Sequence, residues 1–245
     1  MEILKKNLEK MINSLSAEDR GKLKNRLEDL ISVYPFNEYE YIISSLLGIG
    51  KITIDDYLEI RDEYIARNMY LYIFEISAPR GFGEQWAQGH LKELVPELIK
   101  PTKKLEENYS GQYDFLYKMP KKKMVKIEVK ASRAVDFKTS EPLYVKALAW
   151  ESKKPFDMNF QQVKSKCCDV FVWVGVWRDV IKYWVLSSKE VESNKYYSKG
   201  QHRGNIGEGQ LHLKHDNIKE FRKYEVQPKD LLNKIIKAYK RQNSK

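Results

Sequence analysis

A nearly unbroken apolar run, DVFVWVGVW at residues 169–177, limits the folds that this chain can adopt. Such a run is typical of a central strand that is buried on both faces of a sheet. Residues 181–186 form a second expected strand that follows it. The run is well short of the ~20 apolar residues that a membrane-spanning helix needs, so we expect no membrane partner.

Composition predicts a globular, intracellular protein. Of the 245 residues, 42% are hydrophobic and 12% aromatic, which excludes a disordered chain despite 32% charged residues. The opening MEILKKNLEK lacks a signal-peptide pattern, and we expect a cytoplasmic location. Cys167 and Cys168 are adjacent, and with only four histidines they argue against a structural zinc site.

Apolar residues recur at helical spacing near the N-terminus, and we expect a helical region over residues 1–75. A helix over 38–47, a break at residues 48–50 and a helix after Thr53 have the outline of a helix-turn-helix. The second of these helices is too acidic to be a good reader of the DNA major groove. Its acidic residues are Asp55, Asp56, Glu59, Asp62 and Glu63.

Residues 76–245 are expected to form the core. A helix is predicted over 84–98, a short helix over 159–166, and an amphipathic helix over 231–241 near the end of the chain. These helices and the strands together predict an α/β protein.

Charge is divided unequally along the chain. The 44 Lys and Arg residues exceed the 34 Asp and Glu residues, which gives a net charge of +10. Residues 1–113 contain 15 basic and 19 acidic side chains, whereas residues 114–245 contain 29 and 15. The basic half indicates a polyanionic partner, of which nucleic acid is the commonest in cells. A lysine-rich solubilising surface is the alternative.

Alternating residues over 113–117 and 125–129 predict a β-hairpin. If the hairpin turns about residue 121, Asp114 lies directly opposite Glu128. Glu128 and Lys130 are two residues apart on one strand, so their side chains leave the same face. The other face, toward a core, would carry Tyr113, Phe115, Tyr117, Val125, Ile127 and Val129.

Asp114, Glu128 and Lys130 together predict a phosphodiester hydrolase site. Two opposed carboxylates repel each other unless a cation binds between them. Mg²⁺ is suited to this position because it prefers one or two carboxylates together with water and phosphate oxygens. Lys130 adds a positive group that can hold, or help to deprotonate, an attacking water.

The same tripeptide pattern occurs again as Glu151-Ser152-Lys153, with Asp136 upstream. E-x-K is a common pattern in a chain rich in Lys and Glu, so the pattern alone decides nothing. The second copy has no alternation around it, and no strand is expected to orient its side chains. The hairpin copy is therefore the preferred site.

The segment YDFLYKMPKKKMVKIEVKAS resembles the catalytic hairpin of the PD-(D/E)xK nuclease superfamily, and within it of type II restriction endonucleases. The resemblance covers about residues 80–190. It implies a mixed central sheet flanked by helices in an α/β/α core. It also implies that Asp114 and Glu128 bind Mg²⁺ and that Lys130 serves the water. Tyr113 stands where the name-giving proline of the family would be.

Supporting residues are proposed around this hairpin. Glu84 is a further candidate catalytic acid, although a Glu in a first turn also stabilises a helix N-terminus. Polar residues that could contact phosphates or base edges come after the hairpin and in the glycine-rich segment 201–212, where a flexible connector is the alternative. The candidate DNA contacts are Ser132, Arg133, Gln162, Arg203, Asn205 and Gln210.

The expected function is that of an Mg²⁺-dependent, site-specific endonuclease acting on double-stranded DNA. A homodimer is expected because two related active sites suit a palindromic target. One alternative is a repair, nicking or junction-resolving nuclease of the same superfamily. Another is a DNA-binding protein without catalysis, in which the N-terminal helices contact DNA.

Overall fold

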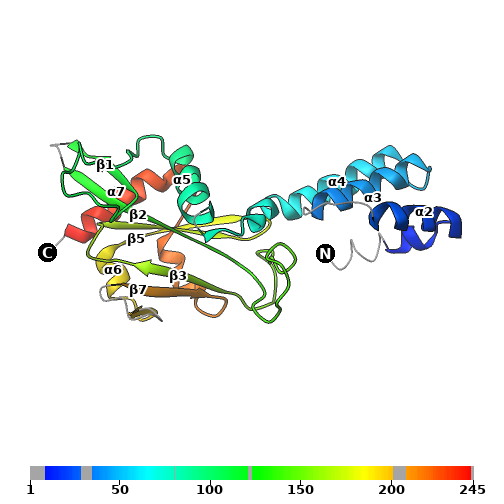
Figure 1. The fold of residues 1–245 in the computed structure, drawn as a ribbon. Helices are drawn as coiled ribbons and strands as arrows, with labels where there is room; N and C mark the ends of the chain where they lie inside the picture. The colour runs from blue at the N-terminus through cyan, green and yellow to red at the C-terminus, as the bar shows by residue number, and fades with distance from the viewer. Residues whose placement is uncertain (1–8, 29–34, 80, 121–122, 201–207, 244–245) are drawn as a thin grey trace.

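A computed structural model describes residues 9–28, 35–79, 81–120, 123–200 and 208–243. The body of the protein is built on two β-sheets, and an arm of N-terminal helices extends from one side of it (Figure 1). The arm has a hydrophobic cluster of its own, separate from the two clusters that pack against the sheets.

The larger sheet is mixed and has the strand order β1-β2-β4-β5-β8. β2 and β4 run parallel, and the other neighbouring pairs are antiparallel. This sheet confirms the expected α/β class with a mixed central sheet. Its strands are β1 (Phe115–Lys118), β2 (Met124–Arg133), β4 (Val170–Val176), β5 (Ile181–Ser187) and β8 (Glu225–Val226).

β4 is the strand predicted from the apolar run, and all of its residues are buried. Alternate side chains enter different cores, with Val172 in one and Trp173 in the other. Gly175 allows close packing here, because a Cβ at this position would lie 2.8 Å from the ring of Trp184. The prediction of a central strand that is buried on both faces is therefore confirmed.

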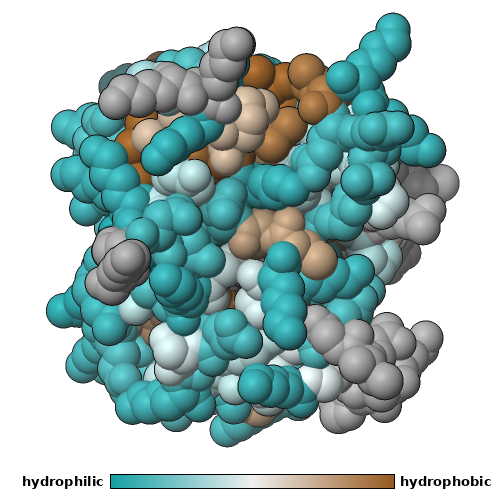
Figure 2. All heavy atoms as spheres, turned by 90° about the vertical axis from the view of Figure 1, so that its left-hand side faces the viewer, coloured by the Kyte–Doolittle hydropathy of each residue, from teal (hydrophilic) through white to brown (hydrophobic). Residues whose placement is uncertain are grey.

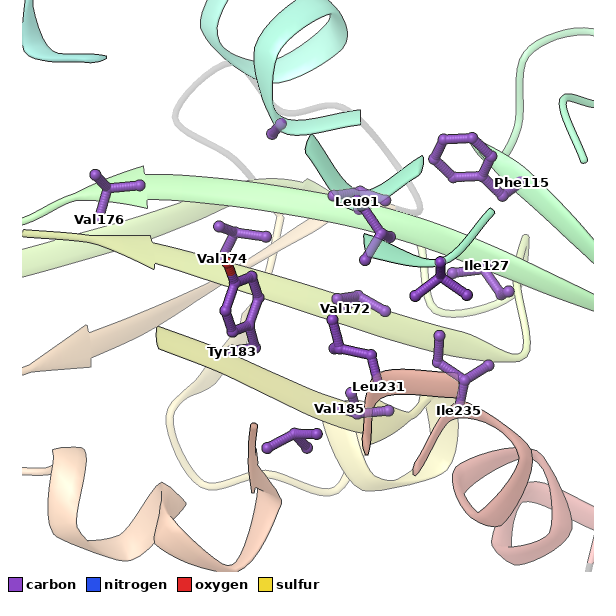
Figure 3. Close-up of a cluster of buried hydrophobic side chains, with 14 of the residues drawn as sticks. Leu91, Phe115, Ile127, Val172, Val174, Val176, Tyr183, Val185, Leu231 and Ile235 are labelled. Carbon is purple, nitrogen blue, oxygen red and sulfur yellow. The ribbon is translucent and has the colours of Figure 1, made fainter. Parts of the chain in front are cut away.

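Helices cover the first face of the larger sheet. Leu91 of α5 (Gln88–Leu94) and Leu231 and Ile235 of α7 (Leu231–Asn243) pack against the β4 valines (Figure 3). The short helical segments η1 (Leu71–Glu75) and η2 (Gly81–Ala87) complete this layer.

The predicted C-terminal helix is confirmed by α7. The helix predicted over 84–98 is shorter, because α5 ends at Leu94. Pro96 follows closely, and proline disfavours helical geometry in the residue before it.

A second, three-stranded sheet covers the opposite face, in the order β3-β7-β6. Its strands are β3 (Asp157–Val163), β7 (Gly209–Lys214) and β6 (Tyr197–Lys199). The short helices α6 (Ser188–Glu192), η4 (Ile218–Tyr224) and η5 (Pro228–Asp230) lie in the same part of the chain. Helices therefore cover one face of the larger sheet, and mainly a second sheet covers the other. The expected α/β/α core would have helices on both faces.

The prediction of a short helix over 159–166 is wrong, because β3 occupies residues 157–163. Met158 and Phe160 are fully buried against the larger sheet, whereas Asp157 and Asn159, which alternate with them, are partly exposed. Burial of every second residue matches the period of a strand, and pairing with β7 satisfies the backbone of this segment.

The N-terminal arm contains α2 (Ala17–Glu28), α3 (Pro35–Gly48) and α4 (Ile54–Asn68), as the helical spacing predicted. Thr53 and Asp56 form a capping box at the start of α4. None of the helices in the described ranges combines the length and apolar composition needed to cross a membrane.

Candidate active site

The hairpin has the register that the sequence predicts. Phe115 pairs with Ile127 and Lys118 with Met124, and Asp114 lies one residue before the first of these pairs. The backbone N–H of Asp114 donates to the carbonyl of Ile127 at 3.0 Å, and because Ile127 is already the partner of Phe115, the regular pairing does not continue to Asp114. The predicted register is confirmed within β1 and β2, but the pairing does not place Asp114 directly opposite Glu128. The two carboxylates are nevertheless close, since the charge of Asp114 raises the pKa of Glu128.

Tyr113 does not share the face of Phe115, contrary to the expectation. Phe115 and Ile127 pack in the cluster under the helices, whereas Tyr113 is buried in the cluster under the second sheet. Regular pairing begins at Phe115, so strict alternation does not extend back to Tyr113. The Tyr113 hydroxyl donates to the carboxylate of Glu106, which fixes the ring on this side.

The carboxylate of Asp114 is held at both oxygens. Its Oδ2 accepts a hydrogen bond from the backbone N–H of Val129 at 2.8 Å. Its Oδ1 accepts one from Nε2 of Gln88 at 2.5 Å. These two hydrogen bonds fix the orientation of the carboxylate.

Glu128 and Lys130 form an ion pair, with Lys130 Nζ 2.7 Å from Glu128 Oε1. Their side chains are only 15% and 17% exposed, respectively. The pKa of Glu128 is raised to about 7, because burial and the charge of Asp114 outweigh the lowering effect of Lys130 and Lys164. Glu128 therefore lies close to two cations and one carboxylate, and its charge is sensitive to any further cation.

The second sheet brings additional charges to this site. Lys164, just after β3, lies 3.1 Å from the carboxylate of Glu208, just before β7. Tyr109 is also close to the site, and burial together with the charges of Asp114 and Glu128 raises its pKa.

Sequence reasoning missed Gln88, Tyr109 and Lys164. Gln88 follows Glu84 by one helical turn, which is a signal that could have found it. Lys164 joins the site through contacts between two sheets, and no local pattern marks such contacts.

The charged residues of the site fit Mg²⁺ better than a metal that needs many protein ligands. In the described part of the chain, no group of three or more His, Cys, Asp or Glu side chains is arranged to hold a metal ion. Mg²⁺ needs only one or two carboxylates and completes its shell with water and substrate phosphates. Asp114 and Glu128 could supply those carboxylates.

Arg133 is engaged inside the protein. It donates from Nη1 to the carbonyls of Ile73 and Ile76, at 3.1 and 2.7 Å, and its guanidinium lies 4.1 Å from the ring centre of Phe82. Burial lowers its pKa to about 10. These contacts join the end of β2 to the segment around η1, and the expected phosphate contact stays a prediction.

The other predicted residues are scattered in the structure. Ser132 is partly exposed near the end of β2. Gln162 is exposed at an irregularity of β3, with a φ of 54° in the left-handed region. Gln210 lies on β7, where its Oε1 accepts from Nδ2 of Asn159 at 3.1 Å. Glu84 lies in η2.

Three of the predicted side chains are beyond what the structure can test. Arg203 and Asn205 lie outside the described residues. The side chain of Glu84 also lies outside them, although the backbone of η2 is described. The roles suggested for these residues stay predictions.

No family model matches the chain, and comparisons with curated proteins and with solved structures gave no match. The functional argument therefore depends on the geometry and charge of the site.

Proposed function

We propose that this chain is an Mg²⁺-dependent, site-specific endonuclease that hydrolyses phosphodiester bonds of double-stranded DNA. The observation that carries the proposal is that the carboxylate of Asp114, bound to the N–H of Val129, lies next to Glu128, which forms an ion pair of 2.7 Å with Lys130. A carboxylate pair beside a mostly buried ammonium suits a reaction in which negative charge develops on a phosphate.

Asp114 and Glu128 would hold Mg²⁺, which when bound supplies Lewis acidity and lowers the pKa of its water. Asp114 is suited to this because the N–H of Val129 and the amide of Gln88 fix its orientation before any ligand arrives. Lys130 presents its ammonium on the face of Glu128 and can orient the attacking water or stabilise the charge on the phosphate.

Charge also supports DNA as the substrate. The half of the chain that begins at Asp114 contains 29 basic and 15 acidic residues. Exposed lysines flank the turn of the hairpin at Lys118 and Lys123, and hydrophilic residues cover most of the face at that end of the molecule (Figure 2). Phosphate contacts by such lysines supply affinity without sequence selection.

The proposal includes a restriction-endonuclease-like core and a homodimer. The mixed sheet with the hairpin at its edge and helices on one face supports such a core. Two copies related by a two-fold axis would bring two active sites to the two strands of a palindromic target.

Cleavage of supercoiled plasmid DNA with and without Mg²⁺ tests the proposal. Discrete fragments that depend on Mg²⁺ are the expected result. Nicked circles, or a preference for branched DNA, would instead indicate a nicking, repair or junction-resolving nuclease. Binding without any cleavage would contradict the enzymatic function and leave a DNA-binding protein.

A further inference from the structure

A chain of polar contacts leads from Asp114 to a lysine outside the hairpin. Gln88, the first residue of α5, donates from Nε2 to Asp114 Oδ1 at 2.5 Å. Lys100 donates from Nζ to Oε1 of the same Gln88 side chain. The amide of Gln88 therefore links a cation to the carboxylate of Asp114.

The direction of these contacts is fixed by chemistry. An ammonium has donors and no acceptor, so the atom of Gln88 that faces Lys100 must be the carbonyl oxygen. The amide nitrogen then faces Asp114 and donates to its carboxylate. An ionised carboxylate has no donor and acts only as an acceptor. Lys100 thus determines which end of Gln88 meets the carboxylate.

The fold holds Lys100 in this place. The residue before it, Ile99, exchanges two backbone hydrogen bonds of 2.8 Å with Leu116 of β1. The ammonium of Lys100 also lies 4.3 Å from the ring centre of Phe115, the neighbour of Asp114. The segment after α5 is therefore attached to the same strand end that carries Asp114.

We infer that Gln88 is a positioning residue for the cation site, oriented by Lys100, and this inference rests on the proposed function. Together with the N–H of Val129, Gln88 fixes the plane of the Asp114 carboxylate. An amide orients the carboxylate without adding a charge that would compete with a divalent ion. Groups that orient a metal ligand in this way typically contribute 10- to 100-fold to metal affinity or activity.

A purely structural role is the competing explanation, because the same contacts attach α5 to the hairpin. The two explanations differ in what a variant changes. A structural contact affects the unfolding temperature of the metal-free protein, whereas a positioning contact affects the affinity of the folded protein for a divalent ion.

Direct titration with Mn²⁺, followed by electron paramagnetic resonance without DNA, separates these explanations. We expect Gln88→Ala to weaken Mn²⁺ binding about 10-fold in protein shown to be folded. Lys100→Met, which keeps an apolar stem over Phe115, should weaken it by a smaller factor. Gln85→Ala is the matched control, since Gln85 is exposed in the neighbouring η2.

Equal Mn²⁺ affinity in wild type and folded Gln88→Ala would overturn the inference and leave the proposed nuclease intact. The inference would also be overturned if Gln85→Ala lost as much Mn²⁺ affinity as Gln88→Ala. If wild-type protein neither binds Mn²⁺ nor cleaves DNA, the proposed function fails, and the inference fails with it.

Discussion

Two copies of the same tripeptide pattern occupy very different places in this molecule. Glu128-Val129-Lys130 lies on β2, where the Glu and Lys side chains are mostly buried and form an ion pair of 2.7 Å. Glu151-Ser152-Lys153 lies outside any strand, and its Glu and Lys are exposed.

The acidic residue upstream of each copy differs in the same way. Asp114 accepts hydrogen bonds from the N–H of Val129, next to Glu128, and from the amide of Gln88. Asp136 accepts hydrogen bonds from the ammonium of Lys154 at 2.8 Å and from the backbone of Lys138 at 3.0 Å. Asp136 is therefore part of a loop contact, and the comparison teaches that the strand, rather than the tripeptide, assembles the candidate site.

Substitution of the two lysines should give the largest difference between these regions. We expect Lys130→Ala to lower the rate of Mg²⁺-dependent DNA cleavage roughly 100-fold or more, because it removes a preorganised positive group from the site. Lys153→Ala should leave the rate unchanged. Single-turnover cleavage rates of the two variants provide the measurement, and equal losses would remove the distinction.

The pH dependence of stability should distinguish the two glutamates. Glu128 has a pKa of about 7 in the folded chain against an ordinary 4.5, so the folded state binds more protons between these values. Its contribution to stability is complete below about pH 4.5 and declines as pH rises through 7, with a slope of at most about 1.4 kcal/mol per pH unit.

Urea unfolding of metal-free protein at several pH values between these limits measures this contribution. Glu128→Gln should flatten the decline in the free energy of unfolding, whereas Glu151→Gln should keep the wild-type slope. The slope is the relevant quantity, because Glu128→Gln also removes the partner of Lys130. Parallel curves for all three proteins would contradict the buried environment of Glu128.

The middle residues of the two tripeptides allow a smaller test of packing. Val129 is 6% exposed and belongs to the core under the helices. We expect Val129→Ala to lower the free energy of unfolding by about 2 kcal/mol, since it removes buried methyl groups. Ser152→Ala should change it by less than about 1 kcal/mol, because the Ser152 hydroxyl only accepts from the backbone of Lys154 at 3.2 Å. Chemical denaturation of both variants gives the comparison.

The sequence predicted those parts of the fold that depend on local pattern. The apolar residues of β4 and the alternation of the hairpin specify strands directly, and the same alternation predicted the register that pairs Phe115 with Ile127. The helical arm was likewise predicted from apolar spacing and from the cap at Thr53.

Contacts between distant segments could not be predicted in this way. β3 was expected to be helical because its short alternating pattern is ambiguous until β7, about fifty residues later, pairs with it. Gln88 reaches Asp114 across 26 residues, and Lys164 reaches the site from the second sheet. These positions depend on tertiary packing, which a sequence window does not contain.

Cleavage of plasmid DNA by Asp114→Asn, beside wild-type protein in Mg²⁺, tests the central claim most directly. Thermal unfolding first establishes that the variant is folded, and a binding assay establishes that it still retains DNA. The account predicts discrete fragments from the wild type and none from Asp114→Asn. A folded Asp114→Asn variant that cuts DNA at the wild-type rate would contradict the assignment of this hairpin as the active site.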